Sequence, residues 1–580
     1  MARYHWRPRS LSTLILIALA AAVTLAAASS ASALSKGQLD PSFGSGGIAS
    51  VSSGTELLGT AVQSDGKVVA VGASGVGTPT LHLLIARFTT SGRLDPTFSG
   101  GQVTGPANVL GQAVAIQSDG KIVVTGTTTD STGGSTLGVV IMRLNSNGSR
   151  DGRFGSGGVV TTLTRAAHGQ GNAIAVAPSG EIIVAGDGAI TSGPNQFFPG
   201  VALVRVSTTG HLDGSTVFDL GKFSIATGVA VQPDGKIVVG GTQRGDLQTT
   251  QTLAARFQSN GTRDTSFAHG LFVHQYAVGA AYSGFNAVAL QPDGKVVLAG
   301  TALNGSTGIN TLVVRLTSGG GLDSSFGSGG AVNISAANNA LSASAQNEPY
   351  GALGVVVAAG EIFTAGWYDN FHLKQLALWG LTSSGRLDPG FGSGGRTLVP
   401  GSGTNSLQGN AIAIGPTGKL AVAATSIPLL GGGAQGLVAQ FGGPPLPPPR
   451  HTISNLHVTS STFRAAKRGG SIGPTGMKIS YTSSIAGKTI FTVLQPLPGV
   501  KSGKRCVAPP KKRRRGQKSC TRTLTLGSFT HNDTTGSNAF RFTGRVGGRT
   551  LAPGRYTLRI VPVTLGNVKQ TFLVRFTIIR

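Results

Sequence analysis

Apolar and polar residues alternate in short runs that recur along most of the chain. In the copy at 113–124, AVAIQ leads into the turn SDGK and then into the β-branched run IVV. Alternation over four to six residues on both sides of a Gly-containing turn predicts the two strands of a hairpin. A third apolar run follows a variable loop, and a polar LDPSF-like turn and a GSGG segment then lead into a fourth run. The pattern therefore predicts units of four short strands.

The unit occurs in seven copies between residues 39 and 441. The glycines of the first turn lie 54 to 66 residues apart, and they are Gly66, Gly120, Gly180, Gly235, Gly294, Gly360 and Gly418. A repeat of this length with four strands in each unit indicates the blades of a β-propeller. We therefore predict an all-β fold, with a seven-bladed β-propeller over residues 34–442 and a small Ig-like β-sandwich after it.

The two ends of the repeat region complement each other. The region begins with an LDPSF turn and a fourth run at 39–51, and it ends at Phe441 on a third run. We expect Ile48–Ser52 to supply the outer strand of a blade whose other three strands come from 410–441. Such closure removes most open sheet edges, which otherwise template aggregation.

The unit, written as AVAVQPDGKIVVAG, then ARF, then GxLDxSFGSGG, resembles the delta-60 repeat. That repeat is found in secreted bacterial proteins and has no known function. The resemblance implies a propeller and brings no known catalytic residues. The stretch from TISNLHVTSSTFRAA to RYTLRI is similar to a β-sandwich module at the ends of bacterial secreted proteins, and it implies no activity either.

A charge pair recurs with the repeat, because an Arg precedes the Asp of the LD turn by eight residues in five copies. One interpretation is a ring of carboxylates for a metal or ligand. The other is an ion pair or Asx turn that fixes each corner. We favour the corner, because a repeat needs its corner in every copy. The pairs are Arg87–Asp95, Arg143–Asp151, Arg205–Asp213, Arg256–Asp264 and Arg315–Asp323.

The sixth copy departs from the repeat, since it holds two of the three tryptophans together with irregular polar residues. Aromatic rings beside carboxylates suit sugar or cation binding. The alternative is a diverged blade that repacks with larger side chains. The ligand-binding candidates are Glu361, Trp367, Tyr368, Asp369 and His372. The chain has no HExxH motif, and we predict no catalytic residue, metal site or cofactor.

The first 33 residues have the features of a secretory signal peptide. Arg3, Arg7 and Arg9 precede an apolar run from Leu11 to Ala28, and Ala31-Ser32-Ala33 offers a cleavage site. These features predict export, with a retained membrane anchor as the alternative. No other stretch reaches 18 apolar residues, so we expect no transmembrane segment after cleavage and a secreted or extracellular location.

The charge of the chain is concentrated after a Pro-rich linker at 443–450. Residues 450–580 contain 24 Lys and Arg against one acid, Asp533, which gives +23 of the total +27. Cys506 and Cys520 flank a basic loop, and in an exported chain they predict a disulfide. The cluster suits an anionic partner, with a solvated loop as the alternative, and it lacks the interleaved aromatics of nucleic-acid sites. Its residues are Lys511, Lys512, Arg513, Arg514, Arg515 and Lys518.

Together these features predict a monomeric, non-enzymatic binding or scaffold protein at the cell surface. The propeller is the ligand platform, and the basic domain at 451–580 contacts anionic envelope polymers or glycans, including those of the cell wall. Two alternatives stay open. One is a secreted carbohydrate-active hydrolase or lyase, and the other is a purely structural surface protein.

Overall fold

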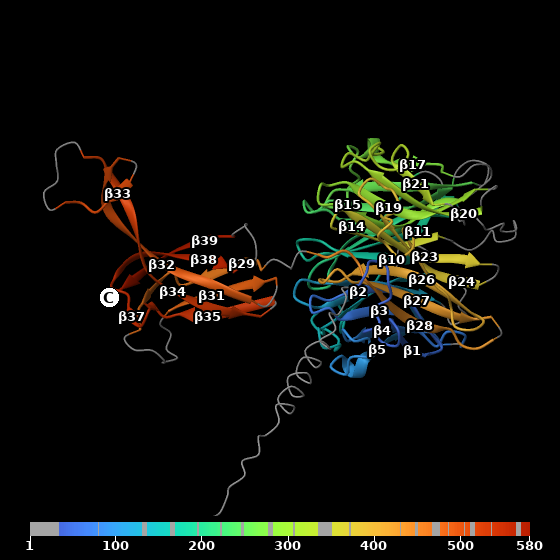
Figure 1. Ribbon diagram of the computed structural model, residues 1–580, viewed down its shortest axis with the longest axis horizontal. Helices are drawn as coiled ribbons and strands as arrows, with labels where there is room; N and C mark the ends of the chain where they lie inside the picture. The colour runs from blue at the N-terminus through green and yellow to red at the C-terminus, as the bar shows by residue number, and fades with distance from the viewer. Residues whose placement is uncertain are drawn as a thin grey trace, which may run out of the picture.

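In the computed structural model the regular secondary structure of the described residues is β-strand apart from short 3-10 turns, and the strands form two bodies that follow each other in the chain (Figure 1). Within the described residues, no helix has the length and apolarity that a membrane span requires. The predicted signal segment at 1–33 lies outside these residues. The structure describes residues 34–78, 80–129, 136–162, 169–193, 196–220, 223–244, 249–276, 282–304, 308–334, 351–370, 373–429, 431–446, 451–466, 476–484, 487–503, 505–510, 517–534, 536–563 and 570–580.

Seven four-stranded antiparallel sheets make up the described part of the first body. Six of them take four consecutive strands, as the repeat predicts. Short 3-10 turns at Ser99–Gly101 and Ala268–Gly270 precede the fourth strand of two sheets. The six sheets are β2–β5 (Thr55–Val62, Val68–Ser74, His82–Phe88, Gln102–Ala107), β6–β9 (Val109–Ile116, Ile122–Thr129, Thr136–Leu144, Val159–Thr162), β10–β13 (Gly169–Val176, Ile182–Gly193, Gln196–Val206, Leu212–Phe218), β14–β17 (Ser224–Val231, Ile237–Arg244, Thr250–Phe257, Phe272–His274), β18–β21 (Ser283–Leu290, Val296–Asn304, Gly308–Leu316, Ala331–Ile334) and β22–β25 (Gly351–Ala358, Glu361–Asn370, Leu373–Leu381, Arg396–Val399).

The turn of each first hairpin has a local physical cause. In the second sheet, Gly120 N donates to Gln117 O at 2.9 Å, and Gly120 has a φ of +83°. Only glycine takes this conformation without strain. The Asp119 side chain accepts from Lys121 N at 3.1 Å, which closes the turn as an Asx motif. The recurring DGK sequence is therefore turn chemistry.

The middle strands of each sheet are covered on both faces. In β3, six of the seven residues are buried, and every one of the six is apolar or glycine. A strand packed against sheets on both sides loses the alternation of a half-exposed strand. This explains the continuous runs such as VVAVGA, which alternate less than the first strands.

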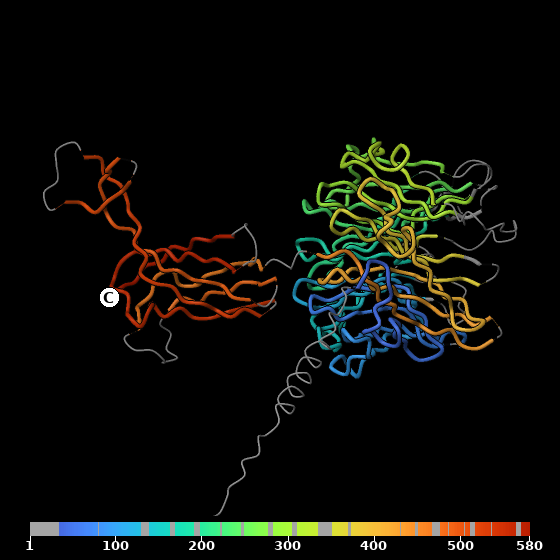
Figure 2. The backbone as a smooth tube through the Cα atoms, viewed as in Figure 1, coloured from blue at the N-terminus to red at the C-terminus, as the bar shows by residue number. Residues whose placement is uncertain are grey.

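The seventh sheet joins the two ends of the repeat region, as predicted. Strand β1 (Ile48–Ser53) pairs antiparallel with β28 (Gln435–Phe441), next to β27 (Leu420–Pro428) and β26 (Asn405–Ile414). The register matches Ile48 with Ala439 and Ser50 with Leu437. Each first strand contacts the first strands of its two neighbours, and β26 contacts β2, which closes the circle. The blue and orange segments consequently lie side by side in Figure 2.

The second body contains two larger sheets around one hydrophobic core. Phe491, Leu558 and Ile560 from one sheet pack with Met477 and Ile479 from the other, all fully buried. One sheet is β29–β31–β35 (Ile453–Thr459, Met477–Ser483, Gly536–Phe542); the other is β30–β39–β38–β32–β33 (Thr462–Arg464, Phe572–Ile579, Gly554–Pro562, Gly487–Ser502, Arg505–Val507) with β34 (Ser519–Asp533) also on β32, and β36 (Arg545–Val546) pairs with β37 (Arg549–Thr550).

Candidate functional site

The recurrent Arg–Asp pairs lie at the corner where the third strand leads to the LD turn. In four copies the Arg Nε bonds the Asp Oδ2 across a corner from which water is largely excluded, since these side chains are 3 to 9% exposed. A guanidinium nitrogen also donates to a turn carbonyl of the next sheet, as Arg143 does to Thr208 O at 2.6 Å. The Nε–Oδ2 distances are 2.9 Å for Arg87–Asp95, 3.0 Å for Arg143–Asp151, 2.8 Å for Arg256–Asp264 and 2.7 Å for Arg315–Asp323.

Each corner carboxylate is fully occupied by partners within the fold. Asp95 Oδ1 accepts from the Thr97 backbone N–H at 3.0 Å, and Lys67 of the first turn lies 3.2 Å from Oδ2. Burial raises the pKa of Asp95, but the bonds from Thr97, Lys67 and Arg87 outweigh it and lower the pKa to about 2. The guanidinium lies over the buried Phe98 ring at 4.5 Å. These carboxylates hold the corner together and have no free oxygen to offer a ligand.

The prediction of an Arg205–Asp213 pair is wrong. Arg205 Nε bonds Glu181 Oε1 at 3.0 Å, and Asp213 lies beside His211 at 3.0 Å. The cause is a coupled change of sequence. Glu181 stands where five other copies have the turn Lys, and β13 begins at Leu212, directly after the turn 207–211, so Asp213 lies within the strand and faces solvent. The arginine keeps its role with a carboxylate from the first turn of the same sheet.

In the sixth copy the cation at the equivalent corner comes from the start of the described chain. Gly380 stands where five other copies have Arg, and an added Cβ there would lie 2.5 Å from Phe391 Cγ. Lys36 Nζ instead bridges Glu361 Oε1, at 2.9 Å, and Asp388 Oδ2. Glu361, which sequence analysis assigns to a ligand site, is therefore part of a corner ion pair.

The described side chains of the sixth copy's other candidates, Trp367 and Tyr368, do not form a shared cleft with Glu361. Glu361 and Asp369 stand at opposite ends of β23, eight residues or roughly 26 Å apart at about 3.3 Å per residue. Trp367 is 3% exposed, and Lys374 Nζ lies 4.0 Å over its ring. The expected open aromatic platform is therefore wrong for Trp367. Tyr368 packs against the core and under Arg396 at 5.5 Å, while His372 and the Asp369 side chain lie outside the described residues.

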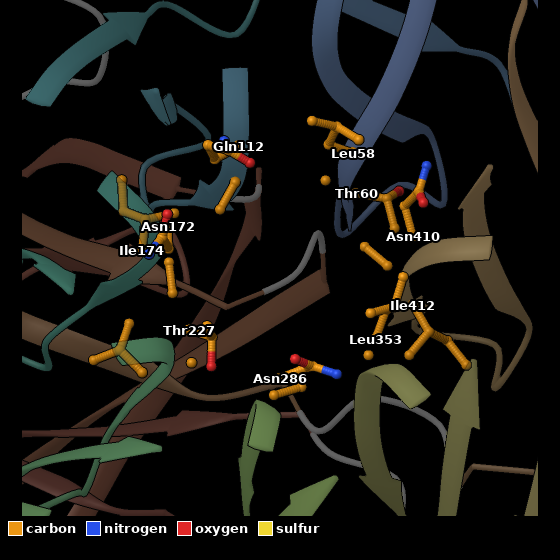
Figure 3. A pocket seen from close by; sticks show the side chains of 18 of the residues that line it. Leu58, Thr60, Gln112, Asn172, Ile174, Thr227, Asn286, Leu353, Asn410 and Ile412 are labelled. Atoms are coloured by element: carbon orange, nitrogen blue, oxygen red, sulfur yellow. The ribbon is translucent and has the colours of Figure 1, made fainter. Parts of the chain in front are cut away.

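A central cavity of about 410 Å³ is lined by all seven first strands, β2, β6, β10, β14, β18, β22 and β26. Each strand contributes three consecutive residues, for example Asn172, Ala173 and Ile174 (Figure 3). The middle residue is always Gly or Ala. At Gly59 an added Cβ would lie 2.8 Å from Gln112 O of the next strand, so small residues let neighbouring strands approach.

The first residue of each triplet is the extra residue of a β-bulge, because the pairing register shifts there in every sheet. A bulge aims its side chain away from the regular alternation. Four of these side chains donate to the carbonyl just before the next bulge: Asn172 to Ala226 O (2.9 Å), Thr227 to Phe285 O (2.5 Å), Asn286 to Ala352 O (2.9 Å) and Asn410 to Leu57 O (2.7 Å). The seven bulge residues are Leu58, Gln112, Asn172, Thr227, Asn286, Leu353 and Asn410.

The cavity presents amide and hydroxyl groups, and none of its lining side chains is charged. Such a lining suits water or a neutral polar group. These four bonds could not be predicted from the sequence, because each one joins a bulge residue to a carbonyl more than 50 residues away. The available signal was the polar residue at the bulge position, which is present in five of the seven copies.

The basic second body buries its single acid. Asp533 is 5% exposed and accepts from Tyr481 Oη (2.5 Å) and Thr489 Oγ1 (2.5 Å), with His531 Nδ1 at 2.7 Å and His451 Nε2 at 2.9 Å. Burial raises the pKa of Asp533, but the bonds from His531, Thr489 and Tyr481 outweigh it and hold the pKa below its usual value. No described acid therefore remains at the surface of this body.

Its exposed strand positions carry cations on both sheets. Lys478 of β31 and Arg541 of β35 are direct cross-strand partners, and both are exposed. Like charges placed directly opposite each other are destabilising in a sheet. The exposed cations among the described residues are Arg464, Lys478, Lys488, Lys501, Arg505, Lys518, Arg541, Arg549, Arg555, Arg559, Arg575 and Arg580.

A long hairpin of β32 and β34 projects from this body, and β33 lies at its end (Figure 1). The predicted disulfide is confirmed, since Cys506 and Cys520 are joined with a Cα–Cα distance of 6.0 Å. Gly499 lies against the bridge, where a Cβ would come within 2.5 Å of Cys506 Sγ. We name the four cations Lys501, Arg505, Lys518 and Arg522 the arm cations. The predicted loop residues Lys511, Lys512 and Arg513–Arg515 lie outside the described residues.

Comparison with known families supports the propeller repeat. Four segments match a family model described as "Domain of unknown function (DUF5122) beta-propeller", at residues 63–98, 117–154, 232–267 and 291–326. Each segment runs from the first turn through the LD turn to its buried Phe. The match agrees with the resemblance found in the sequence and assigns no function to the repeat. No curated protein matches the chain significantly.

Solved structures resemble the chain at low identity. A polysaccharide lyase, Uly1, has a TM-score of 0.38 and 12% identity over 67% of this chain and 90% of its own. Sqt1 from Chaetomium thermophilum has a TM-score of 0.33 and 10% identity, over 68% and 97%. A glucose dehydrogenase has a TM-score of 0.31 and 12% identity, over 68% and 99%. At these values their activities do not transfer to this chain.

Proposed function

We propose that the chain is an exported protein whose seven sheets are the blades of one closed seven-bladed β-propeller at 34–442. The circle of first strands and the sheet shared by β1 and β28 support this architecture. Residues 443–450 then link the propeller to an Ig-like β-sandwich at 451–580. Export rests on the signal-like residues 1–33 and on the disulfide, because disulfides persist in oxidising compartments.

The function that the geometry supports best is non-enzymatic binding of an anionic envelope polymer by the basic sandwich, with the propeller as a rigid platform. The observation that carries this proposal is the burial of Asp533 among four partners. Because the only acidic side chain of residues 450–580 is in the core, every charged side chain that the described surface presents is a cation. A surface of one sign raises the local concentration of polyanions and speeds their association.

The projecting hairpin of β32 and β34, which carries the arm cations, gives this cationic surface a defined contact. The disulfide ties β33 to β34 across the end of β32, so Arg505 and Lys518 are held on the same end of the hairpin. Lys501 N donates to Lys518 O at 2.9 Å, which fixes the same end of the hairpin. A rigid cationic ribbon loses little conformational freedom on binding, and preorganisation of this kind improves affinity. We therefore assign the first contact with the polymer to the arm cations.

The test measures retention of the full chain on purified cell wall and on poly(glycerol phosphate), with uncharged dextran as the control polymer. A chain ending at residue 446 should lose retention. Exchange of the four arm cations for Gln should reduce retention more than exchange of Arg555, Arg559 and Arg575 on the sheet. Equal retention on dextran, or retention by the chain ending at 446, would exclude the sandwich as the anchor.

A further inference from the structure

Among the described residues, one boundary between consecutive sheets has no cation at the position where the others contain one. At five boundaries an arginine of the third strand donates to a turn carbonyl of the next sheet, and at the sixth Lys36 fills the corner. The seventh boundary lies between the sheet that closes the circle and β2–β5. Here the position before the last residue of β28 is Gln440, where the equivalent position of β4 is Arg87.

A cavity of about 330 Å³ occupies this boundary, and we name it the Gln440 cavity. It lies between the turn 415–419 of the closing sheet and the residues Ser64, Asp65, Gly66 and Thr90 of the first. Gly415 also stands where the second copy has Gln117, whose Nε2 bonds Gly180 O across its own boundary at 3.3 Å. At this boundary the long side chains of the equivalent Arg and Gln positions are therefore replaced by the shorter Gln440 and Gly415.

Three polar groups at the cavity bear on what it can bind. Gln440 is 4% exposed, and its Oε1 has no hydrogen-bond partner among the described residues. Thr90 occupies the turn position of Thr208, whose carbonyl accepts from Arg143. The Asp65 carboxylate, 54% exposed, stands on the lining. The only charged donor on the lining, Lys419, already pairs with Asp40.

The neighbouring corner also lacks a cation that its equivalents have. Asp95 is held by both Arg87 and Lys67, whereas Asp40 has Lys419 alone. A guanidinium at this place would complete the set of partners that four other corners share. Its planar fork of five donors matches two separated acceptors better than a compact ammonium does.

We propose that the Gln440 cavity is a binding site for a guanidinium group, supplied by a small guanidino compound or by an arginine side chain of another polypeptide. The group enters between the exposed turn residues Ser64, Thr90 and Thr417. It donates to Gln440 Oε1 and to the Thr90 carbonyl, with Asp65 at the entrance. This site is independent of the basic sandwich, so its test does not depend on the polymer proposal.

Calorimetric titration of the full chain with ethylguanidinium chloride tests the site, and n-propylammonium chloride is the control cation. We expect millimolar binding of ethylguanidinium and at least tenfold weaker binding of propylammonium. N-acetyl-arginine methylamide distinguishes the two sources: binding at least as tight as ethylguanidinium indicates an arginine side chain, and weaker binding indicates a small compound. No binding of ethylguanidinium, or equal binding of both cations, overturns the proposal.

Two substitutions locate the binding. Gln440→Arg supplies the missing guanidinium from within, so the heat of ethylguanidinium binding should disappear while the unfolding temperature rises. Asp65→Asn should weaken binding at least threefold, whereas Asp119→Asn, at the equivalent exposed turn of the second copy, should leave it unchanged. If Gln440→Arg fails to fold, the Asp65 and Asp119 pair decides. Equal binding by these two variants, or undiminished binding by a folded Gln440→Arg, contradicts the assignment.

Discussion

Substitution of Lys36 by Met should destabilise the propeller more than its position before the first strand suggests. Lys36 Nζ is the cation shared by Glu361 and Asp388, which lie 325 and 352 residues away in sequence. Burial lowers the pKa of Lys36, but bonds to the two carboxylates outweigh it and raise the pKa above its usual value. Met keeps the length of the side chain and removes the charge, so the variant isolates the ion pairs.

The expected loss follows from the exposure of the three groups. The side chains of Lys36, Glu361 and Asp388 are 24%, 26% and 13% exposed. A fully buried charge left without its partner costs about 3–5 kcal/mol, and an exposed pair contributes less than about 1 kcal/mol. Two half-buried pairs broken together should therefore lower the free energy of unfolding by about 1–3 kcal/mol. Gly380→Arg cannot restore the cation, because Phe391 occupies that space.

Tryptophan fluorescence during urea unfolding measures this loss directly. Trp367 and Trp379 both lie in the β22–β25 sheet, whose corner Lys36 completes. In a chain that begins at Leu34 they are the only tryptophans. We expect the midpoint to fall by about 0.5–1 M urea. Lys36 lowers the pKa of Asp388, so the ion pair stabilises the fold at any pH above the ordinary pKa of an Asp carboxyl. The difference in unfolding free energy between wild type and Lys36→Met should therefore shrink as the pH falls below that ordinary pKa.

Lys67→Met is the matched control, because Asp95 keeps Arg87 at 2.9 Å when Lys67 is lost. The control should lose no more than about 0.5 kcal/mol. Equal losses in the two variants, or a Lys36→Met difference that is constant down to pH 3, would refute the reasoning. The first result would mean that the corner of the sixth copy does not depend on the added cation.

Three further predictions concern the corner, the bulges and the sandwich. Since its partners lower the pKa of Asp95 to about 2, this carboxyl should contribute about 2 kcal/mol above pH 4 that is lost towards pH 2; acid titration of Asp95→Asn should lack that component. Asn410→Ala removes the bond to Leu57 O and should cost about 1–2 kcal/mol in urea unfolding, whereas Gln112→Ala at an equivalent bulge should cost under about 0.5 kcal/mol. Asp533→Asn should destabilise the sandwich by about 2–4 kcal/mol, seen by calorimetry as a lowered second transition with the propeller transition unmoved.

The strands could be predicted because their causes are local in sequence, and the shared sheet could be predicted from the count of strands in each repeat. The SDGK turn carries its own Gly and Asx chemistry, as Gly120 and Asp119 show. The missing fourth strand after Phe441 and the extra one at 39–51 could only complete each other if the circle closes. Nothing local signals Lys36, since its partners become neighbours only when that circle has formed.

The sixth copy shows why the candidate site could not be read from residue types. Trp367, Tyr368 and Glu361 have the composition of a ligand site, but burial and strand direction decide their roles. Trp367 is covered by Lys374, and Glu361 stands at the far end of its strand. The Gln440 cavity is the reverse case, because the sequence contains no motif for it. It arises where the repeat lacks its usual Arg. It becomes visible only when the equivalent corners are compared in space.

Dependence of polymer binding on salt tests the central claim most directly, namely that the cationic sandwich anchors the protein to an anionic polymer. The affinity of the full chain for poly(glycerol phosphate) is measured between 50 and 300 mM NaCl, a range set by counter-ion screening. The account predicts a linear fall of log K with log salt. Exchange of the four arm cations for Gln should make the slope less steep by about one for each lost contact. A slope near zero, or one unchanged by the exchange, would contradict the account.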